Sequence, residues 1–257
     1  MAAMIDLNSD LGESFGAWTM GMDEEVLNHI SSSNIACGWH GGDAEVMLRT
    51  VRAAKARNVA VGAHPGYPDL LGFGRRNMTC TPDELYAYTI YQTGALMGAC
   101  AAEGVEMQHV KPHGAMYNQA AKDPKLAGAI ARALKNLGGG LILMGLAGSV
   151  FEAAAAEHGV PFASEAFADR GYMADGSLVP RSQPGAFIHD PNEAAARMLK
   201  LVKEGTVETP DGQTLKLKAH TICMHGDNPA AVKMAEIVKN TLESNGVAVR
   251  NLREILK

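Results

Sequence analysis

Short apolar, β-branched segments alternate with longer amphipathic segments along nearly the whole chain, at roughly 30-residue spacing. The short runs predict strands, and the longer segments, with apolar stripes at helical spacing, predict helices. This alternation is typical of parallel β/α units and predicts an α/β fold. We expect strands over residues 4–10, 33–36, 59–63, 107–110, 141–146, 161–163, 219–224 and 247–250, and helices over 23–30, 43–57, 81–103, 123–137, 149–158, 192–204 and 229–244.

Polar, titratable residues follow nearly every expected strand. Catalytic residues of β/α barrels lie at the C-terminal ends of the strands, whereas an open doubly wound sheet concentrates its site at one switch point. No G-x-G-x-x-G pattern follows the first strand, which also disfavours the open sheet. We therefore predict a TIM-like barrel of seven or eight strands. The strand-end residues are Asp10, His40, His64, Lys111, His113, Glu165, Asp169, His225 and Asp227.

The length and net charge of the chain limit how many domains it can form and which classes of partner it can bind. With 257 residues, we expect one barrel domain over 1–257, with a hairpin insertion near 206–217 where Asp211-Gly212 forms a typical hairpin turn. The net charge is −5 and no basic stripe occurs, so nucleic acid and acidic membrane are not expected as partners. Without a long apolar run, a signal-peptide pattern or closely spaced cysteines, we expect a cytoplasmic protein with reduced thiols.

The first expected strand carries an unusual set of polar residues. Asp6, Asn8 and Asp10 alternate, so in an extended strand their side chains share one face. Buried carboxylates need cations, hydrogen-bond donors or water, because burying them without partners is costly. The alternative is an Asx-rich turn before a helix. The stretch alone does not decide between a site and a turn.

Four histidines occupy equivalent positions at the ends of expected strands, and each is followed closely by glycine: His40, His64, His113 and His225. One such histidine alone is more often a structural residue than a ligand, but four equivalent positions indicate a shared site. His109 fits this pattern less well. We assign no role to the remaining histidines, which are His29, His158, His189 and His220.

Two interpretations of this polar set remain open. The carboxylates and amide of the first strand, together with His40 and His64, form an oxygen and nitrogen donor set that suits a Zn-type divalent metal. A metal there would activate water or polarise a carbonyl. Without a metal, the same residues form an acid/base network in which carboxylates orient histidines that titrate near neutral pH. The spacing contains no established metal motif, so the sequence does not choose.

Cationic residues near the strand ends are candidates for binding an anionic substrate. Lys111 and His113 share a face of an extended segment, and Lys111 would hold a carboxylate or phosphate as a point charge. Arg170 or Arg181 would clamp a carboxylate with two hydrogen bonds. Residues 146–149, which precede an expected helix, offer backbone amides to an anion. Exposed surface charges and a tight turn of small residues are the alternatives.

Six motifs in this order resemble the LamB/YcsF family, and the resemblance covers essentially the whole chain. None of the motif positions departs from the family pattern. The motifs are DLNSDLGE at 6–13, NIACGWHGGD at 34–43, GAHPGYPD at 62–69, VKPHGAMY at 110–117, EAFADRGY at 165–172 and CMHGD at 223–227.

The resemblance implies a distorted β/α barrel related to polysaccharide deacetylases and glycoside hydrolases of carbohydrate metabolism. It implies ATP-dependent cleavage of the lactam of 5-oxo-L-proline to L-glutamate, with ATP and its Mg²⁺ and with two partner subunits, B and C. In the related deacetylases an Asp and two His bind a metal, and the matching positions here are Asp10, His40 and His64. Self-association is left open.

On this basis we expect each strand-end residue to have one of two roles. Hydrolysis of the activated lactam would use Asp10, His40, His64, His113 and His225, and substrate would be bound by Asn8, Lys111, Glu165, Asp169, Arg170 and Arg181. The chain has no G-x-x-x-x-G-K-[ST] loop, so its nucleotide site is either unconventional or shared with the partners. The alternatives are a stand-alone metal-dependent deacetylase or amidohydrolase acting on a sugar or small amide, and a non-catalytic substrate-binding subunit.

Overall fold

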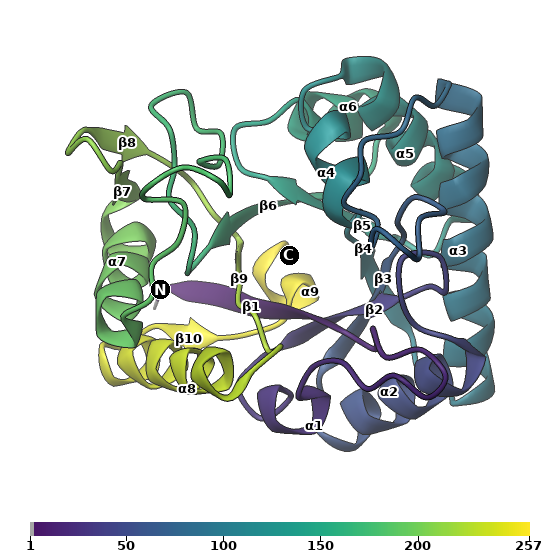
Figure 1. Cartoon of the computed structure of the whole chain (residues 1–257), viewed down its shortest axis with the longest axis horizontal. Coiled ribbons are helices and arrows are strands. Elements are labelled where there is room, and N and C mark those ends of the chain that lie inside the picture. Colours follow the sequence, from purple (N-terminus) through teal and green to yellow (C-terminus); the bar gives the residue numbers. More distant parts are fainter. Residues whose placement is uncertain (1–2) are drawn as a thin grey trace.

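Seven parallel strands close into a barrel in the computed structural model, which describes residues 3–257 (Figure 1). The barrel closes because β1 pairs with β2 on one side and with β9 on the other. A further strand, β10 (Ala248–Val249), pairs with the start of β1. The predicted barrel is confirmed and the open sheet is wrong. Its strands are β1 (Met4–Leu11), β2 (Ser32–Ala36), β3 (Ala60–His64), β4 (Met107–Val110), β5 (Ile142–Leu146), β6 (Phe162–Phe167) and β9 (Thr221–Cys223).

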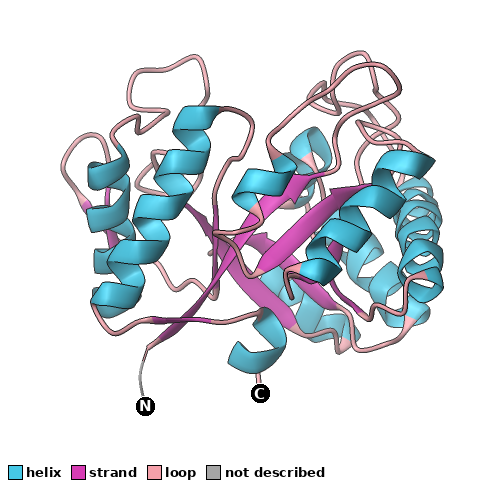
Figure 2. Ribbon diagram, turned by 90° about the horizontal axis from the view of Figure 1, so that it is seen from below, coloured by secondary structure: helices cyan, strands magenta, loops and turns pink. Residues whose placement is uncertain are grey.

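Helices surround the barrel (Figure 2). Apolar side chains fill the space between helices and strands. Asp43 caps α2 through the Val46 amide, and Thr81 with Glu84 forms a complete capping box at the start of α3. In the described part of the chain, no helix is both long and apolar enough to cross a membrane. The helices are α1 (Asp23–Val26), α2 (Ala44–Ala56), α3 (Pro82–Ala102), α4 (Gly114–Ala120), α5 (Pro124–Leu137), α6 (Phe151–His158), α7 (Pro191–Glu204), α8 (Pro229–Ser244) and α9 (Leu252–Ile255).

The short helix α9 lies against the amino-terminal ends of the barrel strands. Leu252 packs with Ile142, Met144 and Ala163 of β5 and β6. Arg253 donates from Nη2 to the carbonyl oxygen of Met107, 3.0 Å away at the start of β4. These contacts cover one end of the barrel, so the carboxyl ends of the strands form the opposite, open end. Outside the barrel, β7 (Thr206–Glu208) and β8 (Thr214–Lys216) form an antiparallel hairpin.

The structure differs from the expected elements at α1, β6, α4, α9 and the cap of α7. Helix α1 ends at Val26, before the expected Ile30. Strand β6 continues to Phe167, so Glu165 lies within the strand, where its side chain finds polar partners inside the barrel. Helices α4 and α9 were not predicted, because α4 starts at a glycine and both are short. Asp190, not Asn192, caps α7, and it accepts a hydrogen bond from the Asn192 amide.

Candidate functional site

The alternating polar residues of β1 face the interior of the barrel, so the Asx-turn alternative is wrong. Asp6 accepts hydrogen bonds from Ser31 and Ser32, both at 2.7 Å, and from Thr221 at 2.6 Å. Although these hydroxyls stabilise the charged form, burial outweighs them and raises the pKa of Asp6 to about 6. Asp6 is fully buried and belongs to the internal structure of the barrel.

The polar atoms of Asn8 are also occupied within the barrel. Its amide nitrogen donates to Thr221 at 2.7 Å, and its Oδ1 accepts from Asn34 at 2.7 Å. Lys111 lies 3.3 Å from the same oxygen. Asn8 therefore connects β1 to β2, β9 and the end of β4, and its expected contact with substrate stays a prediction.

A buried lysine links two carboxylates across the open end of the barrel. Nζ of Lys111 lies 2.9 Å from Asp10 Oδ1 and 2.9 Å from Glu165 Oε1. Burial would lower the pKa of Lys111, but Asp10, Cys223 and Glu165 outweigh it and hold that pKa well above its usual value. Glu165 also accepts a 2.7 Å hydrogen bond from the Tyr117 hydroxyl. The structure thus gives Lys111 a fixed position and a permanent charge.

Asp10 is the part of β1 that reaches the open end. Its Oδ1 also accepts from Asn34 at 2.8 Å, and its Oδ2 lies 3.3 Å from Nε2 of His64. Burial would raise the pKa of Asp10, but His64 and Lys111 outweigh it and hold that pKa well below its usual range. Asp10 is therefore ionised at neutral pH and positioned to orient His64.

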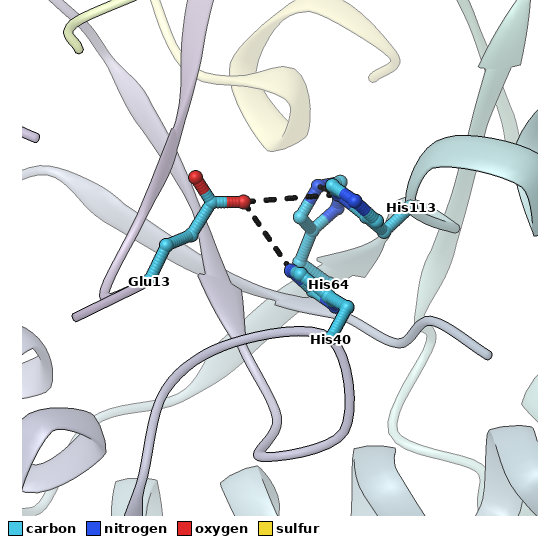
Figure 3. A group of neighbouring side chains, drawn as sticks. All are labelled: Glu13, His40, His64 and His113. Atoms are coloured by element: carbon cyan, nitrogen blue, oxygen red, sulfur yellow. Dashed lines mark hydrogen bonds and ion pairs between the residues drawn. The ribbon is translucent and has the colours of Figure 1, made fainter. Parts of the chain in front are cut away.

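Three of the predicted histidines lie together, and they share a carboxylate that was not predicted (Figure 3). One potential ligand atom from each of Glu13, His40, His64 and His113 lies within 4.8 Å of all the others. Glu13 Oε1 is 3.3 Å from Nε2 of His40 and 3.7 Å from Nδ1 of His113. The rings of His40 and His113 stack at 3.6 Å. Below we call these four residues the Glu/His cluster.

Backbone carbonyls fix the tautomers of two of these histidines. Nδ1 of His64 lies 2.7 Å from the carbonyl oxygen of Lys111, and Nε2 of His113 lies 2.8 Å from that of Phe73. A carbonyl only accepts, so these two nitrogens carry protons. The other nitrogens, Nε2 of His64 and Nδ1 of His113, are 3.0 Å apart and face the cluster. Contacts of this kind orient metal-binding imidazoles in proteins.

The donors of the Glu/His cluster suit a Zn-type metal. One carboxylate with three imidazoles matches the ligand preference of such ions. Burial and neighbouring histidines hold the pKa of His40 and His113 well below the usual value, so both are neutral, as ligands must be. The predicted metal set contained Asp10 with His40 and His64. The structure places Asp10 beside Lys111 and His64, and Glu13 is the carboxylate of the cluster.

Glu13 escaped prediction although it ends the first motif. Gly12 takes a left-handed conformation with φ +68°, which turns the chain just after β1. Glu13 then lies beside His64, the last residue of β3, and beside the histidines that follow β2 and β4. The glycine between two acidic residues, D-L-G-E, was the signal that the strand ends there and that the last carboxylate turns toward the site.

The remaining predicted histidine belongs to a separate pair. Nδ1 of His225 lies 2.6 Å from Oδ2 of Asp169. Burial would lower the pKa of His225, but the hydrogen bond and charge of Asp169 outweigh it and raise that pKa. The expected catalytic role of this Asp/His pair stays a prediction.

A small cavity of about 180 Å³ opens above the buried lysine. Its polar walls include Asp10, His64, Lys111 and His113, so it brings together residues at the carboxyl ends of three different strands. Arg75, Arg170 and Arg181 also line it. The guanidinium of Arg170 donates from Nε to the Ala186 carbonyl at 3.0 Å and from Nη2 to the Val179 carbonyl at 2.7 Å. The cavity combines acid/base groups with positive charge and suits a small anionic substrate.

Comparison with known proteins identifies close relatives over nearly the full length. The family model described as the LamB/YcsF family matches residues 5–257. A curated protein from Bordetella parapertussis, named as the A subunit of 5-oxoprolinase, is 54% identical over 97% of this chain and 99% of its own length. Another with that name, from Pyrococcus abyssi, is 52% identical over 98% of this chain and 99% of its own length.

Solved structures agree with the observed fold. The crystal structure of the lactam utilization protein from Thermus thermophilus superimposes with a TM-score of 0.92, at 49% identity, over 96% of this chain and 99% of that one. A family 4 carbohydrate esterase from Streptomyces lividans gives a TM-score of 0.50 at 12% identity, covering 96% of this chain and 91% of that one. The second likeness concerns the fold alone, and it confirms the predicted similarity of the fold to deacetylase-type barrels.

Proposed function

This chain belongs to the LamB/YcsF family, and we propose that it is the A subunit of an ATP-dependent 5-oxoprolinase, which opens the lactam of 5-oxo-L-proline to give L-glutamate. The observation that carries the proposal is the near-full-length identity of 54% and 52% to proteins of that name. The cavity at the open end of the barrel supplies the kind of site that this reaction needs.

The lactam occupies the small cavity in this proposal. Its carboxylate pairs with one of the arginines that line the cavity, Arg75, Arg170 or Arg181. The reacting carbonyl faces Lys111, whose fixed positive charge stabilises the negative charge that develops on oxygen. The ionised Asp10 lies 3.3 Å from Nε2 of His64 and accepts a proton from the attacking water, while that nitrogen of His64 faces the Glu/His cluster.

A lactam is a stable amide, so ATP is needed to activate it. Phosphorylation of the lactam oxygen by ATP releases ADP and makes the ring carbon electrophilic. One water adds to that carbon and the C–N bond breaks, which gives γ-glutamyl phosphate with the nitrogen as the free amine. A second water then releases phosphate and glutamate. Phosphoryl chemistry of this kind depends mainly on positioning and positive charge.

We propose 5-oxoprolinase subunits B and C as the partners of this chain in the cytoplasm. The sequence contains no standard phosphate-binding loop for ATP, so activation of the lactam requires an unconventional nucleotide site here or a site on a partner. Mg²⁺ accompanies the ATP. The division of the reaction between subunits is tested by the reconstitution below.

The Glu/His cluster is the proposed site for a Zn-type metal, which when bound would polarise water or a carbonyl. Glu13, His40, His64 and His113 would hold it. Metal content of purified protein, measured by mass spectrometry after reconstitution with zinc, tests this assignment. Glu13→Gln should remove most of the metal, whereas Asp10→Asn should retain it. Equal metal content in wild type and Glu13→Gln would refute a metal at this cluster.

A reconstitution experiment tests the proposed function. This chain is mixed with subunits B and C, 5-oxoproline and MgATP, each component is omitted in turn, and glutamate is measured. Glutamate should form only in the complete mixture. His40→Ala and His64→Ala should each abolish it, while His158→Ala, at the distant end of α6, should not.

The same experiment separates the alternatives. Hydrolysis of an amide by this chain without ATP would favour a stand-alone metal-dependent amidohydrolase, which the donor set of the Glu/His cluster would also suit. Full turnover by both histidine variants within the complex would instead favour a non-catalytic binding subunit. Either result would overturn the proposal.

A further inference from the structure

A second, larger cavity adjoins the one proposed for the lactam. It has a volume of about 520 Å³ and lies beside the end of β5, the start of α6 and the loop 175–181. The two cavities share Asn118, Arg170, Leu178 and Arg181 as lining residues. Below we call the larger one the side groove. A group bound in it reaches the small cavity past the two arginines.

The side groove carries excess positive charge. Its cationic lining residues are Lys122, Arg170 and Arg181, and across residues 3–257 none of the three has a carboxylate within ion-pair distance. Asp175 is the acidic residue of the lining, and its Oδ1 accepts from the amide and hydroxyl of Ser177 at 2.9 and 2.6 Å. Three cations against one carboxylate, none of them in an ion pair with it, leave a net positive charge that indicates a site for a multiply charged anion.

The two arginines are held in place by contacts that leave their charge available. Both guanidinium groups lie over the ring of Phe187, at 5.1 Å for Arg170 and 5.2 Å for Arg181. Arg170 is buried and bonds only backbone carbonyls, which do not neutralise it. Fixed guanidinium groups suit phosphate because they present several donors in a rigid plane.

The backbone at the end of β5 adds a donor to the same groove. Gly148 adopts φ +76°, and its amide has no acceptor among the described residues. The neighbouring Ser149 lines the groove as well. The free amide and the three cations together provide hydrogen-bond donors and positive charge for the oxygens of a phosphate.

We propose that the side groove binds the phosphoryl group of the reaction, next to the lactam carbon. The inference rests on the proposed function and deepens it. In the reaction written above, the phosphoryl group stays bonded to an oxygen of the reacting carbon from activation until the final hydrolysis. Its site must therefore adjoin the lactam cavity, as the side groove does through the lining residues that the two cavities share. In this assignment Arg170 and Arg181 bind the phosphoryl group, and Arg75 binds the carboxylate of the substrate.

Product inhibition by inorganic phosphate tests the proposal in the assembled complex. Arg181→Gln and Lys122→Gln should each raise the inhibition constant of phosphate at least about tenfold, because each removes a charge-assisted contact. Lys125→Gln, an exposed lysine outside the groove, is the matched control and should leave it unchanged. Arg75→Gln should raise KM for 5-oxoproline without changing phosphate inhibition. Arg181 and Lys122 are exposed, so these variants should fold.

Two arms of the experiment distinguish the sources of the phosphoryl group. Calorimetric binding of MgATP to this chain alone, weakened by Arg181→Gln, would show that ATP brings it to the groove. Phosphate inhibition sensitive to the variants, without ATP binding to this chain, would show that the lactam arrives already phosphorylated. Both results support the site. Unchanged phosphate inhibition in both groove variants, with normal glutamate formation by wild type, would overturn this inference alone, whereas absent glutamate formation would overturn the proposed function.

Discussion

Replacing Asp6 by asparagine should make the protein more stable at neutral pH. The buried carboxyl of Asp6 lies between Ser31, Ser32 and Thr221, and the raised pKa of about 6 means that ionising it in the folded state is unfavourable. Asparagine has the same shape, its oxygen accepts from both serines, and it carries no charge. The side chain contacts neither cavity, so its effect is on stability.

The size and sign of the effect follow from proton linkage. The unfolded chain releases the Asp6 proton near its usual pKa of about 3.9, and the folded protein releases it near 6, so the folded state binds more protons between these values. The contribution of Asp6 to the free energy of unfolding is fully present below about pH 4 and is lost as the pH rises through about 6. A difference of about two pKa units corresponds to about 3 kcal/mol. The asparagine variant avoids this loss.

Urea unfolding at pH 4 and pH 7 measures the prediction. The free energy of unfolding of Asp6→Asn, relative to wild type, should rise by about 2 kcal/mol between the two pH values, because Asp6 of the unfolded chain is already about half ionised at pH 4. Asp175→Asn is the control with the opposite sign, because hydrogen bonds from Ser177 lower the pKa of Asp175. If the difference between Asp6→Asn and wild type did not change with pH, the three hydroxyl donors would fully offset burial and our reasoning would be refuted.

Three further predictions concern other buried contacts. Lys111→Met should lower the free energy of unfolding by about 3–5 kcal/mol, because it leaves two buried carboxylates without their cation; a loss below about 1 kcal/mol in urea unfolding would contradict this. Gly62→Ala should cost about 1–3 kcal/mol in the same assay, because its Cβ would overlap the His109 ring, and an unchanged midpoint would show that the ring moves freely. Asp169→Asn should lower the pKa of His225 in an NMR titration, since the carboxylate is what raises it; an unchanged value would assign the shift to other charges.

The positions of the strand-end residues could be predicted because local patterns define where each strand stops. The apolar run of β3 ends at His64, and the motif after β4 begins with Lys111, so parallel strands had to bring the two residues to one end of the barrel. The structure places them with Asp10 and His113 around one cavity. Polar residues at every second position of β1 likewise predicted that Asp6, Asn8 and Asp10 share one face, which the structure places inside the barrel.

The side-chain contacts that the site residues make could not be predicted from local sequence patterns. Glu165 resembled a residue of a strand-end loop, because its strand is recognised only by pairing with β5 and β9. Its bond to Lys111 joins two strands that are distant in sequence. Arg170 was expected to meet substrate, but carbonyl groups of its own loop take two of its donors, and a loop conformation leaves no periodic signal.

The closure of the barrel has a consequence for synthesis of the chain. The hydrogen bond from Thr221 to Asp6 joins residues 215 positions apart, so β1 lacks its β9 neighbour until most of the protein has been made. At typical translation rates this exposed edge persists on the order of ten seconds or more. Inward-pointing charges discourage an open edge from pairing with another chain. Until β9 pairs with β1, Asp6 and Asp10 place two carboxylates on the unpaired strand, which disfavours its pairing with another chain.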